Sequence, residues 1–161
     1  MKILLEIFYM RIINAEVSYR RKQVSLSEMG QDPEQIIHSL IKQKYSTSTG
    51  EIEAEFIIHS TSWRYSPPDQ VILTYVVYSD ELNFAQEEVR NLPLEELRTV
   101  SISTPRPFCP IELEKQVVSH AIRHLAFLVK TDHQHKLKHI LSASTIEAYE
   151  SLWVTLAGRV F

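Results

Sequence analysis

The sequence has few of the residues on which several common binding motifs depend. It contains only three glycines, Gly30, Gly50 and Gly158. Phosphate-binding loops of the P-loop and dinucleotide types need closely spaced glycines, because their backbone must approach the phosphate closely. The sequence therefore excludes both motifs, and it also lacks a G-x-S-x-G nucleophile elbow.

Cysteine is almost absent as well. Cys109 is the only one, so no intrachain disulfide can form and a secreted, disulfide-stapled fold is excluded. Cys109 lies between prolines, and Arg106 is the only cation close to it in the sequence. Because a reactive thiol needs neighbouring positive charge to lower its pKa, we interpret Cys109 as a packed or incidental residue.

No long hydrophobic run and no excess of positive charge are present. The apolar stretch from Ile3 to Ile13 is interrupted by Glu6 and Arg11, and it is far shorter than the ~20 residues of a membrane span. The net charge of −3 argues against a nucleic-acid partner. Arg20-Arg21-Lys22 is the clearest basic cluster, and we interpret it as a solvated strand end. These features predict a cytoplasmic protein without a membrane or nucleic-acid partner.

The first half of the chain has patterns typical of strands around one helix. Glutamates alternate with apolar residues from Glu51 to Ile58, which is the period-two signature of a half-buried strand. The turn signal Tyr65–Gln70 separates it from a β-branched run, so a β-hairpin is predicted. The full set of predicted elements is one or two strands over 3–19, a helix from Pro33 to about Tyr45, and strands over 51–58 and 71–78.

The second half favours helices. Residues 80–97 suggest helical turns interrupted at Pro93, and Thr99–Ser103 suggests a short strand. Three helices are predicted. The first spans residues 111–130. The second is capped by Thr131-Asp132 and ends at Leu141, and the third is capped by Ser144-Thr145 and ends at Leu156. The fold class that follows is a single α+β domain over residues 1–161. We expect an antiparallel sheet built around the central hairpin, with the C-terminal helices packed on one face.

The segment from His59 to Arg64 gathers polar and aromatic residues at one predicted strand end. Continued alternation places Ser60, Ser62 and Arg64 on the face of Ile58, where buried hydroxyls and a guanidinium would need partners. One interpretation is a pocket in which Arg64 binds a phosphate or carboxylate. The other is that the strand simply leaves the core here.

The long helix offers a second candidate site. His120 and His124 lie one helical turn apart at the edge of its apolar face, with Arg123 pointing further outward. An i, i+4 histidine pair can bind zinc, but the glutamate of the H-E-x-x-H motif is missing and Arg123 would oppose a cation. We therefore predict no metal and no cofactor. His133, His135 and His139 are interleaved with lysines and are predicted to be solvated surface.

The run His59-Ser-Thr-Ser-Trp-Arg64, the strand around Val71–Tyr75 and the helix His120–Phe127 resemble short uncharacterised proteins of cyanobacteria and actinobacteria. The resemblance covers mainly residues 52–130. It implies a bacterial cytosolic origin and carries no activity, so no catalytic role follows from it.

Two functions remain open on the sequence alone. The first is a ligand- or protein-binding domain, because no complete catalytic motif is present. The alternative is a small hydrolase or transferase acting on a phosphorylated or carboxylated metabolite. In it, His59 or His124 is the acid/base, and Arg64 and Arg123 bind the anion with Ser60, Ser62 and His120 nearby. The predicted partner is a small anionic ligand and, as a further alternative, a second copy of the chain.

Overall fold

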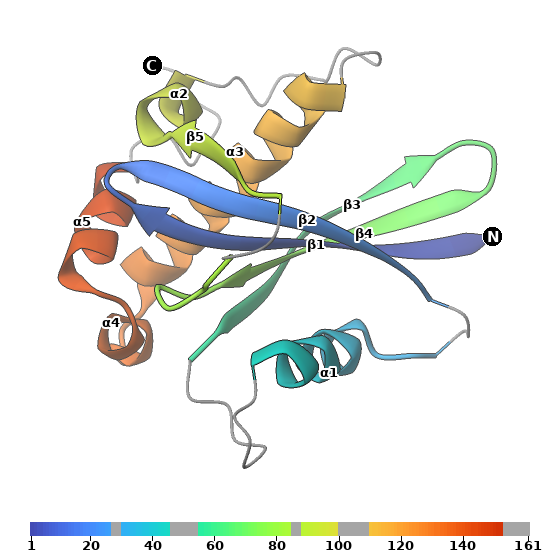
Figure 1. Cartoon of the computed structure of the whole chain (residues 1–161), viewed down its shortest axis with the longest axis horizontal. Helices are drawn as coiled ribbons and strands as arrows, with labels where there is room; N and C mark the ends of the chain where they lie inside the picture. The colour runs from blue at the N-terminus through green and yellow to red at the C-terminus, as the bar shows by residue number, and fades with distance from the viewer. Residues whose placement is uncertain (27–29, 46–54, 85–87, 100–109, 153–161) are drawn as a thin grey trace.

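The fold is a five-stranded mixed sheet with helices on both faces (Figure 1). A computed structural model describes residues 1–26, 30–45, 55–84, 88–99 and 110–152. The strand order is β3-β4-β1-β2-β5. In chain order the elements are β1 (Lys2–Ile13), β2 (Glu16–Leu26), α1 (Pro33–Tyr45), β3 (Ile57–Ser66), β4 (Gln70–Tyr78), β5 (Arg90–Pro93), α2 (Leu94–Thr99), α3 (Pro110–Thr131), α4 (Lys136–Ile140) and α5 (Ala143–Leu152).

The N-terminal apolar stretch forms the centre of the sheet. β1 and β2 make an antiparallel hairpin through Asn14 and Ala15, whose φ angles of 50° and 60° fit a tight turn between twisted strands. β1 is covered on both faces: Leu5 and Ile7 pack toward α1, and Phe8 packs toward α3. A strand buried on both faces reads as a continuous apolar run, which explains its imperfect alternation.

The α+β fold class and the C-terminal helices agree with the prediction, but the sheet differs in two respects. β1 and β4 are parallel, so the sheet is mixed rather than wholly antiparallel. The predicted hairpin is present as β3 and β4, but residues 55–56 are not in a strand and β3 extends from Ile57 to Ser66. In addition, β3 is the edge strand and β1 is central. The sequence pattern identified the hairpin but contained no signal for the long-range pairing of β1 with β4.

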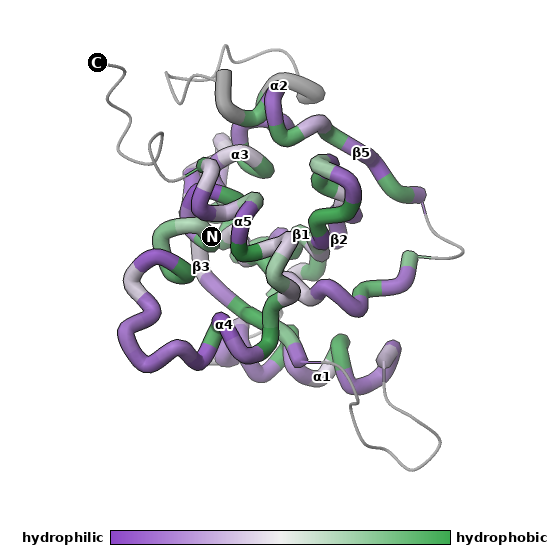
Figure 2. Tube along the Cα trace, turned by 90° about the vertical axis from the view of Figure 1, so that its left-hand side faces the viewer, coloured by the Kyte–Doolittle hydropathy of each residue, from purple (hydrophilic) through white to green (hydrophobic). Residues whose placement is uncertain are grey.

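Each face of the sheet has its own apolar core. α1 covers one face with Ile37 and Ile41, and its polar side is visible in Figure 2. On the other face, α3 packs Val118, Ile122 and Leu125 onto the sheet, and α5 packs beside α3. The C-terminal helices therefore lie on one face, as predicted, and α1 covers the opposite one (Figure 1).

The helix predictions hold best where caps and long periodicity coincide. α1 spans Pro33–Tyr45, and the Asp32 Oδ1 accepts a hydrogen bond of 2.9 Å from the Glu34 amide. Asp132 caps α4 by accepting from the amides of residues 136–138. For α5 the cap is Ser142 rather than Ser144-Thr145, so this helix begins earlier than predicted.

The region after β4 is where the prediction is wrong. Residues 80–84 are not helical and residues 90–93 form β5, so the helical turns predicted before Pro93 are wrong there; the helical turn predicted after Pro93 is present as α2. Thr99 ends α2 instead of starting a strand. The rest of that predicted strand, residues 51–54 and the end of the last predicted helix lie outside the described residues.

Candidate functional site

A β-bulge in β3 decides which side chains share a face of the sheet. Ser60 pairs with Tyr75 and Ser62 pairs with Thr74, so Thr61 is an extra residue without a partner position on β4. An extra residue reverses the alternation for everything that follows it. His59 and Arg64, which strict alternation puts on opposite faces, consequently both lie on the face that α3 covers.

A buried carboxylate on β1 contacts side chains from three other strands on this face. Glu6 of β1 has a side chain that is 1% exposed, and both of its oxygens bind Arg64 of β3, at 2.8 and 2.9 Å. Arg21 of β2 donates to the same carboxylate through Nε at 2.7 Å and Nη2 at 2.6 Å. Thr74 of β4 completes the arrangement with a 3.0 Å hydrogen bond to Oε2. We call Glu6, Arg21, Arg64 and Thr74 the charged cluster.

The electrostatics of the charged cluster keep Glu6 ionised. Burial alone would raise the pKa of the Glu6 carboxyl, but the hydrogen bonds and charges of Arg64, together with Arg21 and Thr74, lower that pKa below its ordinary value. Two guanidinium groups around one carboxylate leave a net charge of about +1. The arginine side chains are 28% and 38% exposed, so part of each guanidinium faces solvent.

The sequence pattern missed Glu6 and misplaced Arg21. In the sequence, Glu6 stands out only as an interruption of an apolar run, and Arg21 only as part of a basic cluster interpreted as a solvated strand end. A carboxylate inside a strand that is buried on both faces needs cationic partners, and this was the available signal. The identity of those partners depends on the β1–β2 register and on the β3 bulge, which local patterns do not specify.

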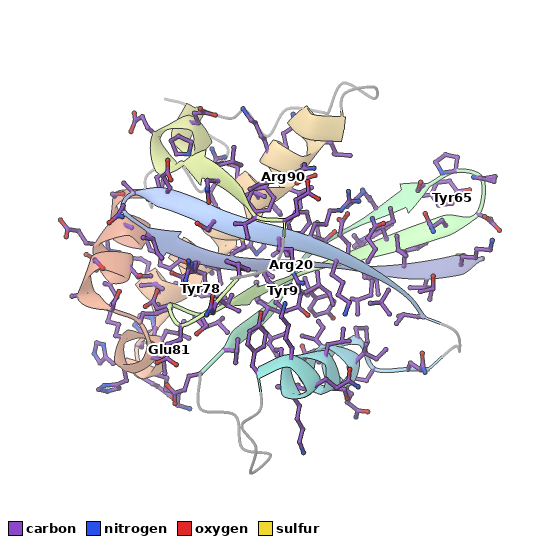
Figure 3. The ribbon with its side chains drawn as sticks, viewed as in Figure 1. Tyr9, Arg20, Tyr65, Tyr78, Glu81 and Arg90 are labelled. Carbon is purple, nitrogen blue, oxygen red and sulfur yellow. The ribbon has the colours of Figure 1, made fainter. Side chains whose placement is uncertain are left out.

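Arg21 also lines a surface pocket of about 380 Å³. Arg90 of β5 and Glu114 of α3 form an ion pair of 2.9 Å at this pocket. In Figure 3, Arg20 on β2 and Arg90 on the edge strand β5 lie well away from Tyr65 at the end of the β3–β4 hairpin. We call this the arginine pocket, and its lining residues are Tyr19, Arg20, Arg21, Glu88, Arg90 and Glu114.

Tyr19 adds a hydroxyl to the arginine pocket. Burial is the main cause that raises the pKa of the Tyr19 hydroxyl to about 12, and a hydrogen bond to Glu114 contributes to the rise. The phenol therefore stays protonated at neutral pH and remains a hydrogen-bond donor. The pocket thus combines cationic donors, two carboxylates and one neutral hydroxyl.

The second polar group on this face consists of imidazoles. His59 Nε2 lies 3.2 Å from His124 Nδ1, and the His120 ring centroid lies 4.4 Å from that of His124. His120 Nε2 lies 3.2 Å from the carbonyl oxygen of Thr61, the bulge residue. Because a carbonyl can only accept, His120 Nε2 carries the hydrogen. We call His59, His120 and His124 the histidine cluster.

Two rings of the histidine cluster, His59 and His124, are largely uncharged at neutral pH. Burial, together with the neighbouring His120 and His59, lowers the pKa of His124 to about 4. Burial also lowers the pKa of His59, against a smaller opposing attraction from Glu34. At pH 7 these two rings can share one hydrogen bond as neutral donor and acceptor.

The predicted site residues are only partly brought together. The structure joins His59 to His120 and His124, while Arg64 is held by Glu6. Arg123 does not point outward as predicted: it is 5% exposed and donates to the Leu97 carbonyl at 3.1 Å. The register shift also separates the two serines, because Ser60 pairs with Tyr75 toward the α1 face and Ser62 with Thr74.

Metal and membrane features are limited within the described residues. No group of three or more histidine, cysteine, aspartate or glutamate side chains there has a geometry able to hold a metal ion. His133, His135 and His139 are exposed, as the sequence indicated. None of the helices in the described ranges is both long enough and apolar enough to cross a membrane.

Comparison with known proteins adds no identity. No protein-family model matches the sequence, and neither curated proteins nor solved structures give a significant match. The arguments about function therefore rest on the charged cluster, the arginine pocket and the histidine cluster.

Proposed function

We propose that this chain is a binding domain for a small anionic ligand, which it holds in the arginine pocket through Arg21. The observation that carries the proposal is the double role of Arg21. Its guanidinium is fixed by the buried Glu6 carboxylate, and the same side chain lines a pocket of about 380 Å³. Pockets for small molecules begin at roughly 300 Å³, so the space suits a small metabolite.

Preorganisation supports this assignment. A free arginine loses rotamer freedom when it binds an anion, and that loss weakens binding. Here Glu6 has already restricted Arg21, and Arg64 holds Glu6 in place with two parallel hydrogen bonds. In this proposal Arg21 contacts the ligand, while Glu6 and Arg64 are positioning residues.

Charge supports the same conclusion. The charged cluster and the arginine pocket together contain four arginines against three glutamates, a local balance of +1. The whole chain has a net charge of −3. A locally positive pocket on a negative protein favours an anion over a cation or a neutral ligand.

The carboxylates of the pocket narrow the class of ligand. Glu88 and Glu114 accept hydrogen bonds, and they repel a second anionic group placed beside them. The matching ligand has one phosphate or carboxylate for Arg21 and amino or hydroxyl donors for the glutamates. Phosphorylated amino alcohols and sugars have this chemistry.

Binding is favoured over the alternative of a hydrolase or transferase by the position of Arg123. That alternative needs Arg64 and Arg123 at one anion, beside a histidine base. Arg123 instead points to Leu97, and the guanidinium of Arg64 is occupied by Glu6. Neither of these arginines is arranged with the histidine cluster as an anion clamp.

Calorimetric titration tests the proposal. We expect phosphoethanolamine and glycerol 3-phosphate to bind more tightly than inorganic phosphate, and ethanolamine not to bind. Arg21→Gln removes the charge that contacts the ligand and should weaken phosphoethanolamine binding about tenfold or more, which corresponds to about 1.4 kcal/mol.

The matched control is Lys22→Gln. Lys22 is the next residue on β2, is exposed, and pairs with Ile7, whose side chain faces α1. It carries the same charge but lies on the other face, so its loss should change the dissociation constant by less than about twofold. Equal effects of the two substitutions, or no binding of any phosphate compound, would contradict the proposal.

A further inference from the structure

We propose that the histidine cluster is a proton-operated latch, which fastens α3 to the edge strand β3 at neutral pH and releases it on acidification. This inference goes beyond the proposed ligand site and does not depend on it. It rests on the position of the three imidazoles, which bridge the helix and the edge strand at the bulge.

The position of the cluster matters because β3 is an edge strand. β3 pairs with β4 on one side, and no other described strand pairs with its outer edge. Edge strands need protection against pairing with other chains, and bulges and covering helices provide it. Here the bulge residue Thr61 presents its carbonyl to His120 of α3. Beside this contact, His59 and His124 join the same helix to β3, so their hydrogen bond sets how closely α3 is held against the edge strand.

The two parts of the cluster respond differently to protons. His120 donates to Thr61 through Nε2, and it can still donate when its other nitrogen is protonated. His59 and His124 need one neutral acceptor nitrogen between them. Protonation of both rings turns that hydrogen bond into a contact between two cations. His120 is thus the fixed contact, and the pair of His59 and His124 is the switch.

The surroundings favour the neutral pair. Val76, directly opposite His59 on β4, is buried and apolar. Among the titratable and charged groups, His120 on α3 disfavours a charge on His124, and Glu34 on α1 attracts a charge on His59 only weakly compared with burial. Arg64, further along β3, is already bound to Glu6. No carboxylate hydrogen-bonded to these rings within the described residues compensates a double charge.

The sign of the pH effect follows from the direction of the shifts. A histidine whose pKa is lowered by folding binds protons more tightly in the unfolded chain. Its contribution to stability is complete above the ordinary value of about 6.5 and is lost as the pH falls toward the folded value. The latch should therefore open between about pH 6.5 and pH 4.

The experiment compares thermal unfolding at pH 7.5 and pH 5 in the wild type and two variants. Between pH 7.5 and pH 5, the unfolding temperature of the wild type should fall by roughly 3–6 °C more than that of the double variant His59→Leu/His124→Leu. The leucines keep apolar bulk but cannot titrate. His38→Gln is the matched control, because His38 is an exposed histidine on α1, which covers the opposite face of the sheet from α3. It should retain the full loss seen in wild type. An unchanged loss in the double variant would overturn the proposal.

A second measurement applies even if the double variant does not fold. Imidazole resonances of the wild type, followed by NMR from pH 8 to pH 3.5, give the titration midpoint of each histidine. We expect His124 to titrate at least one pH unit below the ordinary histidine value of about 6.5. Amides of residues 59–62 should lose protection from hydrogen exchange over the same interval in which His124 titrates. An ordinary midpoint for His124, or unchanged protection of these amides through its titration, would contradict a latch.

Discussion

Two polar clusters lie on the same face of the same sheet, and one is stable when its groups are ionised whereas the other is stable when its rings are neutral. The charged cluster depends on an ionised Glu6 between Arg21 and Arg64. The histidine cluster depends on neutral rings. Both include β3, and the bulge at Thr61 puts both on one side. The difference shows that burial alone does not decide ionisation, because the available partners do.

The comparison also separates structural from functional roles. Glu6 is almost fully buried and has its oxygens satisfied, so it serves to hold two arginines. The hydrogen bond between the rings of His59 and His124 is lost when both rings are protonated. A satisfied ion cluster suits a rigid support for a binding pocket, whereas a titratable pair suits a switch.

The largest effect should come from removing the shared carboxylate. Glu6→Gln leaves two partly buried guanidinium groups without their anion, and we expect a loss of about 3 kcal/mol in the free energy of unfolding. Urea denaturation at pH 7 measures it. Glu81→Gln is the control: Glu81 is exposed and should cost less than about 0.5 kcal/mol. A similar small cost for both would mean that the charged cluster does not stabilise the fold.

The two arginines should differ in a predictable order. Arg64→Met removes the bidentate partner that is 28% exposed, with an expected cost of about 2 kcal/mol. Arg21→Met removes a partner that is 38% exposed while Arg64 still holds Glu6, so about 1 kcal/mol is expected. Denaturation curves for both variants give the comparison. The reverse order would assign the main support of Glu6 to Arg21.

A smaller effect distinguishes the clusters by pH. The lowered pKa of His124, after allowance for solvent screening, predicts a loss of about 1 kcal/mol between pH 6.5 and pH 5. Because the pKa of Glu6 is lowered, the stability that the charged cluster contributes is lost only below the ordinary value of 4.5. Stability measured against pH should thus fall in two stages. His59→Leu/His124→Leu should abolish only the first stage, and a single stage in the wild type would show that the clusters do not titrate separately.

The smallest effect should come from a residue of β3 that belongs to neither cluster. Trp63 pairs with Leu73 and is 72% exposed. Trp63→Ser should cost less than about 0.5 kcal/mol and leave phosphate binding and the pH profile unchanged. Denaturation and calorimetry check this together. A large cost would show that the face of β3 opposite the clusters also carries an essential contact.

The sequence predicts the local parts of this structure and fails on long-range ones. Pro33 after the capping Asp32 defines α1, and long apolar periodicity defines α3. Both signals act within a few residues. The parallel pairing of β1 with β4 joins segments about 70 residues apart, and no local pattern specifies it.

The candidate site follows the same rule. His59, His120 and His124 were selected from the sequence, and the structure brings them together. Glu6 was not selected, because an isolated carboxylate in an apolar strand identifies a need for partners but not the partners themselves. Arg123 was predicted to point outward because helical periodicity identifies only the apolar face of α3. It does not show that α2 packs against a second face of α3, where Arg123 binds the Leu97 carbonyl.

One measurement tests most directly whether the charged cluster, and not the histidine cluster, supports binding. A ¹⁵N-labelled sample is titrated with phosphoethanolamine at pH 7, and amide shifts are followed by NMR. We expect the largest changes around Tyr19, Arg21 and Arg90, with residues 59 and 124 nearly unaffected. Changes centred on His59 and His124, or none at saturating phosphoethanolamine, would contradict support of binding by the charged cluster.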